Sequence, residues 1–223
     1  MYSIFFSKID IGYPYCLNRL KEIISPNSKV VIIPWTMAKE LDSEGLDNYF
    51  SSARKNRYIN LLKLLGIADN NITILNCYHD NLSYMQEKIK ESSVLVLPGG
   101  NPEMLYNKVL STGILDDIKN YKKIIIGASA GTELQLNNYF ITAKNNYYKK
   151  FAWYKGFNVI DNDFYLDVHT SNNYCYLNKL KKVSKETNKK IYAIYDDGVI
   201  IYNRYNKNIE LYGRVLLFNP KNN

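Results

Sequence analysis

The chain has 223 residues, of which 46% are hydrophobic and 22% charged, so it has the apolar content of a large buried core and is not disordered. No apolar run approaches the roughly 20 residues that a membrane-spanning helix requires, and the apolar start, residues 1–6, lacks the basic leader of a signal peptide. We therefore expect one cytoplasmic domain covering residues 1–223, with no membrane partner.

The formal net charge of +8 raises the question of an anionic partner. The basic residues are scattered, however, and the tightest cluster, residues 179–190, falls on a predicted surface helix. The chain is also crowded with Lys, Asn, Ile and Tyr, whose codons are all AT-rich, so a biased genome is a sufficient cause of the charge. We expect no nucleic-acid partner.

The three cysteines, Cys16, Cys77 and Cys175, are far apart and odd in number, and none forms a C-x-x-C pair. This spacing argues against a disulfide framework and against a zinc site. We interpret them as reduced cysteines of a cytoplasmic protein.

The first part of the chain alternates between strand and helix patterns. Apolar runs predict strands over residues 1–6, 29–33, 72–75, 94–97 and 123–126. Helical spacing predicts helices over residues 14–24, 46–65, 81–90, 102–110 and 114–120, with loops at 7–13 and 35–45. This order is typical of a parallel sheet with helices on both faces.

The pattern loosens after Gln135. Residues 139–154 are polar and aromatic without a firm period, followed by a predicted strand at 164–168 and a helix at 174–187. Short antiparallel strands are predicted at 191–195, 199–202, 209–211 and 214–218, separated by turns. The predicted fold is a three-layer, doubly wound α/β fold with a mostly parallel sheet and a C-terminal antiparallel extension.

The segment from Gly127 to Gly131 has the form G-x-S-x-G, with Ser129 at its centre. A predicted strand runs into it and a helix-compatible run, residues 132–136, follows. This context is that of a nucleophile elbow, where small residues allow a tight turn and the serine oxygen is presented at the carboxyl end of the sheet. The alternative is a small-residue turn with an incidental serine.

A serine nucleophile needs a base within hydrogen-bond reach, and the chain has two histidines. His169 ends a predicted strand and follows the serine in the chain, so we predict that it is the base. His79 also follows a strand and is the weaker candidate. For either residue the alternative is a partly buried, hydrogen-bonded imidazole without a catalytic role.

Gly99 and Gly100 follow the predicted strand 94–97. Glycines at such a place let the main chain approach a ligand and direct an N–H group at a developing oxyanion. The N–H groups of Gly100 and Ala130 would form a two-donor oxyanion hole. The alternative is a simple turn in which Asn101 caps the next helix, and both can hold together.

Three segments together resemble one known family: L-P-G-G-N-P followed by a helix, then I-I-G-A-S-A-G, then a strand ending in V-H. The chain is similar in these to the dipeptidase E and cyanophycinase family of serine peptidases. I-I-P-W after the second strand and the late Y-D-D-G turn extend the resemblance over most of the chain.

The resemblance implies a class I glutamine amidotransferase-like, flavodoxin-like α/β fold. It implies Ser129 as nucleophile, His169 as base and Gly100 with Ala130 as oxyanion donors, with Asn101 near the substrate. It also implies cleavage of small peptides, often beside an aspartyl residue, without metal or cofactor.

One departure from the family pattern concerns the third member of the triad. The family has an acid between the serine and the histidine, but the corresponding segment, residues 144–148, contains no carboxylate. Ser171 stands where class I amidotransferases carry their acid. Substitutes are an asparagine or one of four acids, Glu133, Asp167, Asp196 and Asp197.

The leading hypothesis is a serine hydrolase that cleaves a small peptide or isopeptide through an acyl-enzyme. The missing acid favours an alternative, a weakly active or inactive binding protein of the same fold. A third reading is an unrelated esterase of the α/β-hydrolase type. Loops at residues 7–13, 35–45 and 139–154 are the expected walls of the specificity pocket, and the sequence leaves both the substrate and a homodimeric assembly open.

Overall fold

The computed structural model describes residues 1–36, 53–143, 148–161 and 163–221. At its centre is a seven-stranded sheet with the order β11-β10-β1-β5-β4-β2-β3. Strands β1 to β5 pair in parallel, and β10 and β11 add antiparallel strands at one edge. This confirms the predicted α/β class with a mostly parallel sheet. The strands are β1 (Tyr2–Phe6), β2 (Val30–Ile32), β3 (Ile72–Ile74), β4 (Val94–Leu97), β5 (Ile124–Ala128), β10 (Val199–Asn203) and β11 (Ile209–Tyr212).

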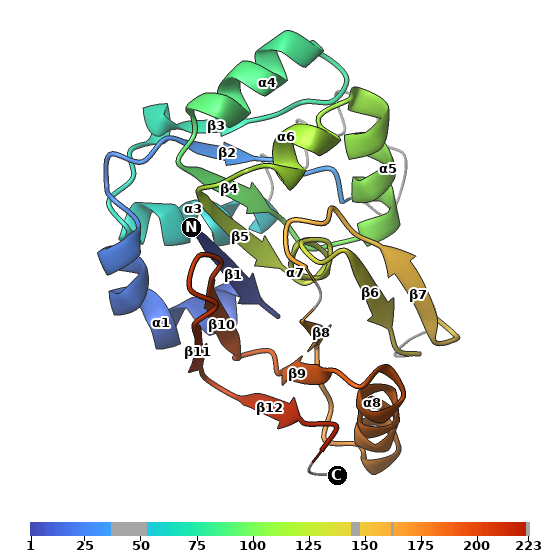
Figure 1. Cartoon of the computed structure of the whole chain (residues 1–223). Coiled ribbons are helices and arrows are strands. Elements are labelled where there is room, and N and C mark those ends of the chain that lie inside the picture. The colour runs from blue at the N-terminus through green and yellow to red at the C-terminus, as the bar shows by residue number, and fades with distance from the viewer. Residues whose placement is uncertain (37–52, 144–147, 162, 222–223) are drawn as a thin grey trace.

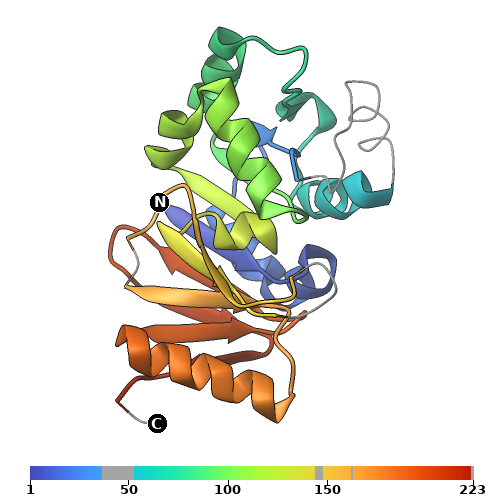
Figure 2. The same cartoon turned by 90° about the vertical axis from the view of Figure 1, so that its right-hand side faces the viewer.

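Helices cover both faces of this sheet (Figures 1 and 2). Helices α1 and α3 pack against each other on one face, and α4, α5 and α6 form the layer on the other. Their bounds are α1 (Ile9–Ile23), α3 (Ala53–Leu64), α4 (Leu82–Glu91), α5 (Pro102–Thr112) and α6 (Leu115–Lys119), with a short 3₁₀ turn, η1, at Asp69–Asn71. No helix in these described ranges is long and apolar enough to cross a membrane.

The middle strands form because they are continuous apolar runs that are covered on both faces. All four residues of β4 are buried, and Pro98 follows the last of them. The registers pair Phe6 with Ala128 and Leu97 with Gly127, so β1, β5 and β4 end at the same level. The segments that follow these strands therefore lie side by side at the carboxyl edge of the sheet, next to the short helix α7 (Ala130–Glu133) (Figure 1).

A smaller, three-stranded sheet with the order β12-β9-β8 lies beside the carboxyl edge of the large sheet. Strand β8 pairs with β9 in parallel and β12 pairs with β9 antiparallel, while α8 packs against β9 and β12. A separate hairpin of β6 and β7 contacts β8. The bounds are β6 (Asn138–Ile141), β7 (Ala152–Lys155), β8 (Phe164–Val168), α8 (Tyr174–Thr187), β9 (Lys190–Ile194) and β12 (Val215–Phe218).

The predicted C-terminal strands exist but are divided between the two sheets. Strands β10 and β11 extend the large sheet, whereas β9 and β12 belong to the small one. The turn between β9 and β10 carries the chain from one sheet to the other, so these two sequence neighbours do not pair. Alternation within a strand indicates which residues share a face, but it does not select the partner strand.

Two local predictions were wrong. The loop expected at residues 7–13 is mostly helix, because α1 begins at Ile9 and continues through Gly12 and Pro14. Gly12 is needed for packing, since a Cβ there would lie 2.8 Å from Cγ2 of Val199 in β10. The aperiodic stretch 139–154 contains β6 and β7, which pair through aromatic side chains such as Phe140 and Trp153, whose ring centroids are 5.3 Å apart.

Three expectations fall partly outside the described residues. Of the helix predicted at 46–65, the structure describes α3 from Ala53 to Leu64. Residues 37–45 of the second loop and residues 144–147 of the segment without a carboxylate also lie outside.

Candidate active site

Ser129 lies in the turn between β5 and α7 with a backbone conformation that L-amino acids rarely adopt, φ 50° and ψ −113°. Its N–H group donates to the carbonyl oxygen of Phe6, at 2.9 Å, which fixes the turn against the end of β1. Small neighbours are required here, because a Cβ on Gly131 would overlap the carbonyl group of Leu97. The elbow predicted from the G-x-S-x-G pattern therefore has the geometry of a strained strand-to-helix turn.

His169 follows β8, and its Nε2 lies 2.8 Å from Oγ of Ser129. Its other ring nitrogen, Nδ1, lies 2.8 Å from Oδ1 of Asp196. In the tautomer that satisfies both contacts, Nδ1–H donates to the carboxylate and Nε2 accepts from the serine hydroxyl. The structure thus brings together the predicted nucleophile and the predicted base.

Asp196 follows β9, and its place is set by the small sheet. Because β8 and β9 are parallel with Val168 opposite Ile194, the residues just past both strands meet. The second carboxylate oxygen, Oδ2, lies 2.7 Å from Nζ of Lys8. Burial acts to raise the pKa of Asp196, but hydrogen bonds from His169 and Lys8 outweigh it and hold the pKa below its ordinary value. The carboxylate is therefore ionised near neutral pH.

The other acids considered for this position have different partners. Asp167 accepts hydrogen bonds from the hydroxyl groups of Thr170 and Tyr176. Asp197 pairs with Arg214, at 3.0 Å. Glu133 is buried in α7. Of the four, Asp196 is the one whose carboxylate bonds to Nδ1 of His169.

The weaker candidate for the base, His79, is not at this site. It is exposed and follows β3, the edge strand, which is separated from β5 by β2 and β4.

The segment after β4 is held in place by two groups from other elements. The N–H of Gly99 donates to the hydroxyl of Tyr58, at 2.9 Å, and its carbonyl accepts from Oγ1 of Thr36, at 2.7 Å. Gly100 has φ 147°, and a Cβ there would overlap the carbonyl oxygen of Thr36, so glycine is required. The side chain of Asn101 caps α5 by accepting from the N–H of Met104, at 3.1 Å. The capping alternative therefore holds, and the oxyanion role of Gly100 and Ala130 stays a prediction.

Ser7 and Lys8 were predicted only as part of the specificity loop at residues 7–13, and their contacts with His169 and Asp196 were not predicted. Ser7 is buried, and its Oγ accepts from the backbone N–H of His169 at 2.8 Å. The same Oγ lies 3.2 Å from Nδ1 of His169 and 3.4 Å from Oδ1 of Asp196. Their position in the chain could have indicated this role, because both residues follow a parallel strand. The carboxyl ends of such strands carry the functional groups in folds of this kind.

A cavity of about 260 Å³ opens beside Ser129. Charged groups on its wall include Lys8, Asp10 and Arg57, of which the last two form an ion pair at 3.3 Å. The lining residues are Ser7, Lys8, Ile9, Asp10, Arg57, Tyr58, Gly99, Gly100, Ala128, Ser129 and His169. Part of the predicted specificity loop at residues 7–13 therefore contributes to the wall, although as the start of a helix.

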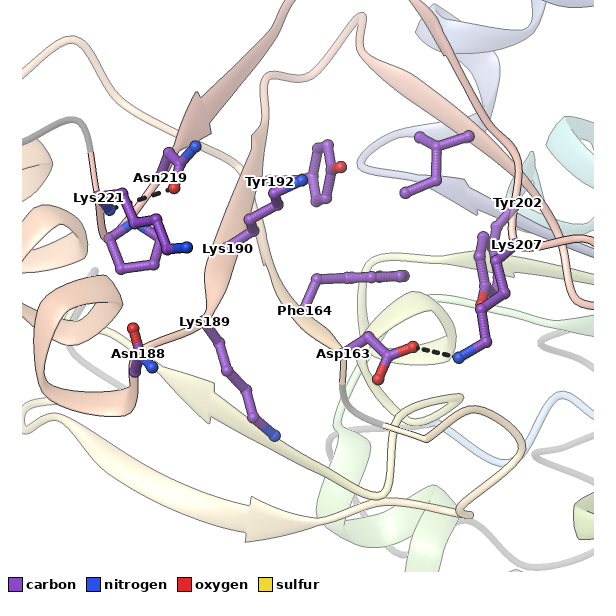
Figure 3. Close-up of a pocket in the computed structure, with 12 residues that line it drawn as sticks. Asp163, Phe164, Asn188, Lys189, Lys190, Tyr192, Tyr202, Lys207, Asn219 and Lys221 are labelled. Atoms are coloured by element: carbon purple, nitrogen blue, oxygen red, sulfur yellow. Dashed lines mark hydrogen bonds and ion pairs between the residues drawn. The ribbon is translucent and has the colours of Figure 1, made fainter.

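A second cavity, of about 420 Å³, lies between the two sheets and is lined by Lys, Tyr and Phe side chains (Figure 3). Its charged groups do not converge on a common point. Lys207 is turned toward Asp163, with which it pairs at 2.8 Å, and Lys189 extends away from Tyr192 and Phe164. Among the described residues that line this cavity there is no serine, cysteine or histidine, and no paired nucleophile and base, so the site beside Ser129 is the candidate active site.

Within the described ranges, no group of three or more His, Cys, Asp or Glu side chains is arranged to hold a metal ion. The chemistry available at this site is that of a hydroxyl, an imidazole and a carboxylate connected by hydrogen bonds. Such a chain can transfer a proton away from the hydroxyl as it attacks an electrophile.

Comparison with known proteins gives one family. Residues 15–209 match the model of peptidase family S51. A search of curated protein sequences returned no significant match.

Two solved structures share the fold. A protein from Listeria monocytogenes EGD-e that has been assigned to peptidase E is 21% identical, with a TM-score of 0.64 and coverage of 94% of this chain and 96% of that one. A peptidase from an acI-B1 Actinobacterium is 15% identical, with a TM-score of 0.68 and coverage of 98% and 91%.

Proposed function

The chain belongs to peptidase family S51, a family of serine peptidases, and from this premise we propose that it hydrolyses a small peptide or isopeptide through an acyl-enzyme on Ser129. The observation that carries the proposal is the continuous hydrogen-bonded chain from Ser129 through His169 to Asp196. Its parts come from three strands far apart in sequence and meet beside a cavity.

In the first step, Oγ of Ser129 attacks the scissile carbonyl carbon while Nε2 of His169 takes the hydroxyl proton. The carboxylate of Asp196 stabilises the imidazolium that forms. The N–H groups of Gly100 and Ala130 stabilise the oxyanion, and one such donor is typically worth about 3 kcal/mol in the transition state.

Collapse of the tetrahedral intermediate expels the amine, which receives the proton from His169. Water then attacks the ester carbonyl of the acyl-enzyme, with the same imidazole as general base, and release of the acid restores Ser129. Every proton transfer uses Nε2, so the mechanism requires that Nδ1 stay bound to Asp196.

The cavity supports a small substrate. A volume of about 260 Å³ can hold one or two residues of a substrate beside Ser129. Lys8 and Arg57 lie on the wall but are ion-paired with Asp196 and Asp10, so a substrate carboxylate such as that of an aspartyl residue would have to compete with Asp10 for Arg57.

The lack of a carboxylate in residues 144–148 was the reason for considering an inactive binding protein. The hydrogen bond between Asp196 and His169 removes that reason, and turnover remains our proposal. The family assignment replaces the reading as an unrelated α/β-hydrolase-type esterase.

A fluorophosphonate probe, which forms a covalent bond with activated serines, tests the proposal. We expect one adduct per chain, mapped to Ser129 by peptide mass spectrometry, and loss of labelling in Ser129→Ala and in His169→Ala. Ser111→Ala, which changes an exposed serine near the end of α5 whose hydroxyl donates to the carbonyl of Lys108, is the matched control and should label normally.

A panel of dipeptides with acidic and neutral first residues, with one β-aspartyl dipeptide, then tests hydrolysis. The acyl-enzyme proposal fails if folded protein is unlabelled at Ser129 and Ser129→Ala leaves peptide hydrolysis unchanged.

A further inference from the structure

We propose that Ser7 and Lys8 are positioning residues that hold the base and the acid of the small sheet against the nucleophile of the large sheet. The inference rests on the proposed function, because it assigns roles in the same reaction. It goes beyond the three reacting residues by naming the groups that keep them in register.

The need for such groups follows from the topology. Ser129 comes from β5 of the large sheet, whereas His169 and Asp196 follow β8 and β9 of the small sheet. A small shift between the sheets would lengthen the contact between Oγ of Ser129 and Nε2 of His169. A misplacement of about 1 Å can cost on the order of 100-fold in rate, so the junction between the sheets must be held.

Ser7 is placed to hold it. It follows β1, whose last residue, Phe6, accepts the hydrogen bond from the N–H of Ser129. The Ser7 hydroxyl oxygen accepts from the backbone N–H of His169, at 2.8 Å. One residue thus fixes the main chain of the base to the strand that also fixes the main chain of the nucleophile.

The Ser7 proton remains available for a second bond. Because Oγ already accepts from the N–H of His169, its own hydrogen can be donated to Oδ1 of Asp196, at 3.4 Å. Oδ1 also receives Nδ1–H of His169. The serine therefore lies between the base and the acid and contacts both. The His169 backbone has φ 55°, a strained conformation that the Ser7 bond helps to maintain.

Lys8 secures the other oxygen of the acid. Its Nζ lies 2.7 Å from Oδ2, so Asp196 is held on one side by His169 and on the other by Lys8. The two side chains of this ion pair are 41% and 40% exposed, and exposed pairs contribute little to stability. We therefore expect this ion pair to affect the orientation and charge of the Asp196 carboxylate more than the stability of the protein. The neighbouring acid, Asp197, is paired with Arg214 and does not compete for Lys8.

Four variants test the inference: Ser7→Ala and Lys8→Met remove the contacts, and Ser7→Thr and Lys8→Arg retain the hydroxyl and the charge. Ser184→Ala and Lys29→Met are matched controls. Ser184 is a buried serine that donates to the carbonyl of Lys189, and Lys29 forms an exposed ion pair with Glu91. Folding is checked by circular dichroism, and kcat and KM are measured against pH with the best dipeptide.

We expect Ser7→Ala to lower kcat by about 100-fold with KM changed less than about twofold, because the base and not the substrate is displaced. Lys8→Met should lower kcat by a smaller factor than Ser7→Ala does. It should also move the acidic limb of the pH–rate profile to higher pH, because a cation beside the Asp196 and His169 pair is lost. The conservative variants should recover most of the rate. The controls should keep the wild-type kcat and profile, whatever stability they lose.

If Ser7→Ala and Lys8→Met fold and keep the wild-type kcat and pH profile, the inference is wrong while the proposed function stands. If Ser7→Ala does not fold, the Lys8→Met and Lys8→Arg pair decides. Absence of turnover and of labelling in the wild-type protein would instead reject the proposed function, and the inference with it.

Discussion

Both proposed reacting residues are among the five non-glycine residues with positive φ in the described part of the chain. Ser129 has φ 50° and His169 has φ 55°, in a region that costs L-amino acids free energy. The backbone N–H groups of both residues donate hydrogen bonds to β1 or the residue after it, that of Ser129 to the carbonyl of Phe6 and that of His169 to the hydroxyl oxygen of Ser7. Asn188, another residue with positive φ, ends helix α8, where that conformation is common. Strain at Ser129 and His169 has no such structural explanation and is consistent with a functional origin.

Asp196→Asn tests the third member of the triad. An asparagine would keep the size of the side chain but remove the charge that stabilises the imidazolium and fixes its tautomer. We expect kcat to fall by about 10⁴-fold with little change in folding. The measurement is peptide hydrolysis, with fluorophosphonate labelling rate as a second readout.

The control is the next residue in the chain. Asp197→Asn breaks an ion pair with Arg214 that does not involve His169, so it should leave the rate unchanged. Equal rate losses in both variants would mean that the turn, and not the Asp196 carboxylate, is what matters.

The three residues of the proposed triad differ in how far each could be predicted from sequence. Ser129 and its turn are specified locally, by five small or hydroxyl residues that span the end of β5 and the start of α7. His169 could be chosen because the chain has so few histidines. Asp196 could only be proposed among alternatives, since its contact depends on the parallel register of β8 and β9, and no local pattern encodes which strands pair.

At the scale of elements, strands and helices with strong periodicity were predicted within a residue or two. The predicted ranges 94–97, 164–168 and 174–187 coincide with β4, β8 and α8. Failures occurred where tertiary packing outweighs local preference. Residues 7–13 were predicted as a loop, with the helix starting at Pro14, but α1 begins at Ile9 and packs on β10. Strands β6 and β7 are stabilised by aromatic pairs across the hairpin and not by alternation.

Asn101 allows a test at the start of α5. Its side chain accepts from the N–H of Met104, so Asn101→Ala should lower the free energy of unfolding by about 1 kcal/mol, measured by urea denaturation. Asn101→Asp should not, because aspartate retains the acceptor. Asn81→Ala is the matched control. It removes the equivalent cap of α4 and should lower the free energy of unfolding by a similar amount.

The same variants test the predicted contact between Asn101 and substrate. Asn101→Asp keeps the cap but replaces the amide with a charged carboxylate, whereas Asn101→Ala removes the amide without adding charge, so a rise in KM shared by both variants would be due to that contact. An unchanged unfolding free energy in Asn101→Ala would contradict the capping role.

On the scale of the whole molecule, the site depends on how the two sheets are joined. The aromatic ring of Phe164, at the start of β8, lies at this junction and is 4% exposed. It makes edge-to-face contacts with Tyr202 of β10 and Tyr192 of β9, each at 5.4 Å between centroids, and with Phe5 of β1 at 6.5 Å. Phe164 therefore packs against β1, the strand that presents Ser7, and against β9, the strand that presents Asp196.

Phe164→Ala should consequently affect both stability and activity, although the ring is at the opposite end of β8 from His169. Loss of a buried phenylalanine costs about 3–5 kcal/mol, because the transfer free energy is lost and a cavity remains. If the junction sets the contact between Ser129 and His169, the folded fraction of the variant should also label more slowly with the fluorophosphonate probe. Ile89→Ala in α4, a buried residue far from the junction, should lose comparable stability but keep the wild-type labelling rate. Equal labelling rates in the two variants, measured under conditions where both are folded, would mean that Ser7 and Lys8 align the site without help from the aromatic junction.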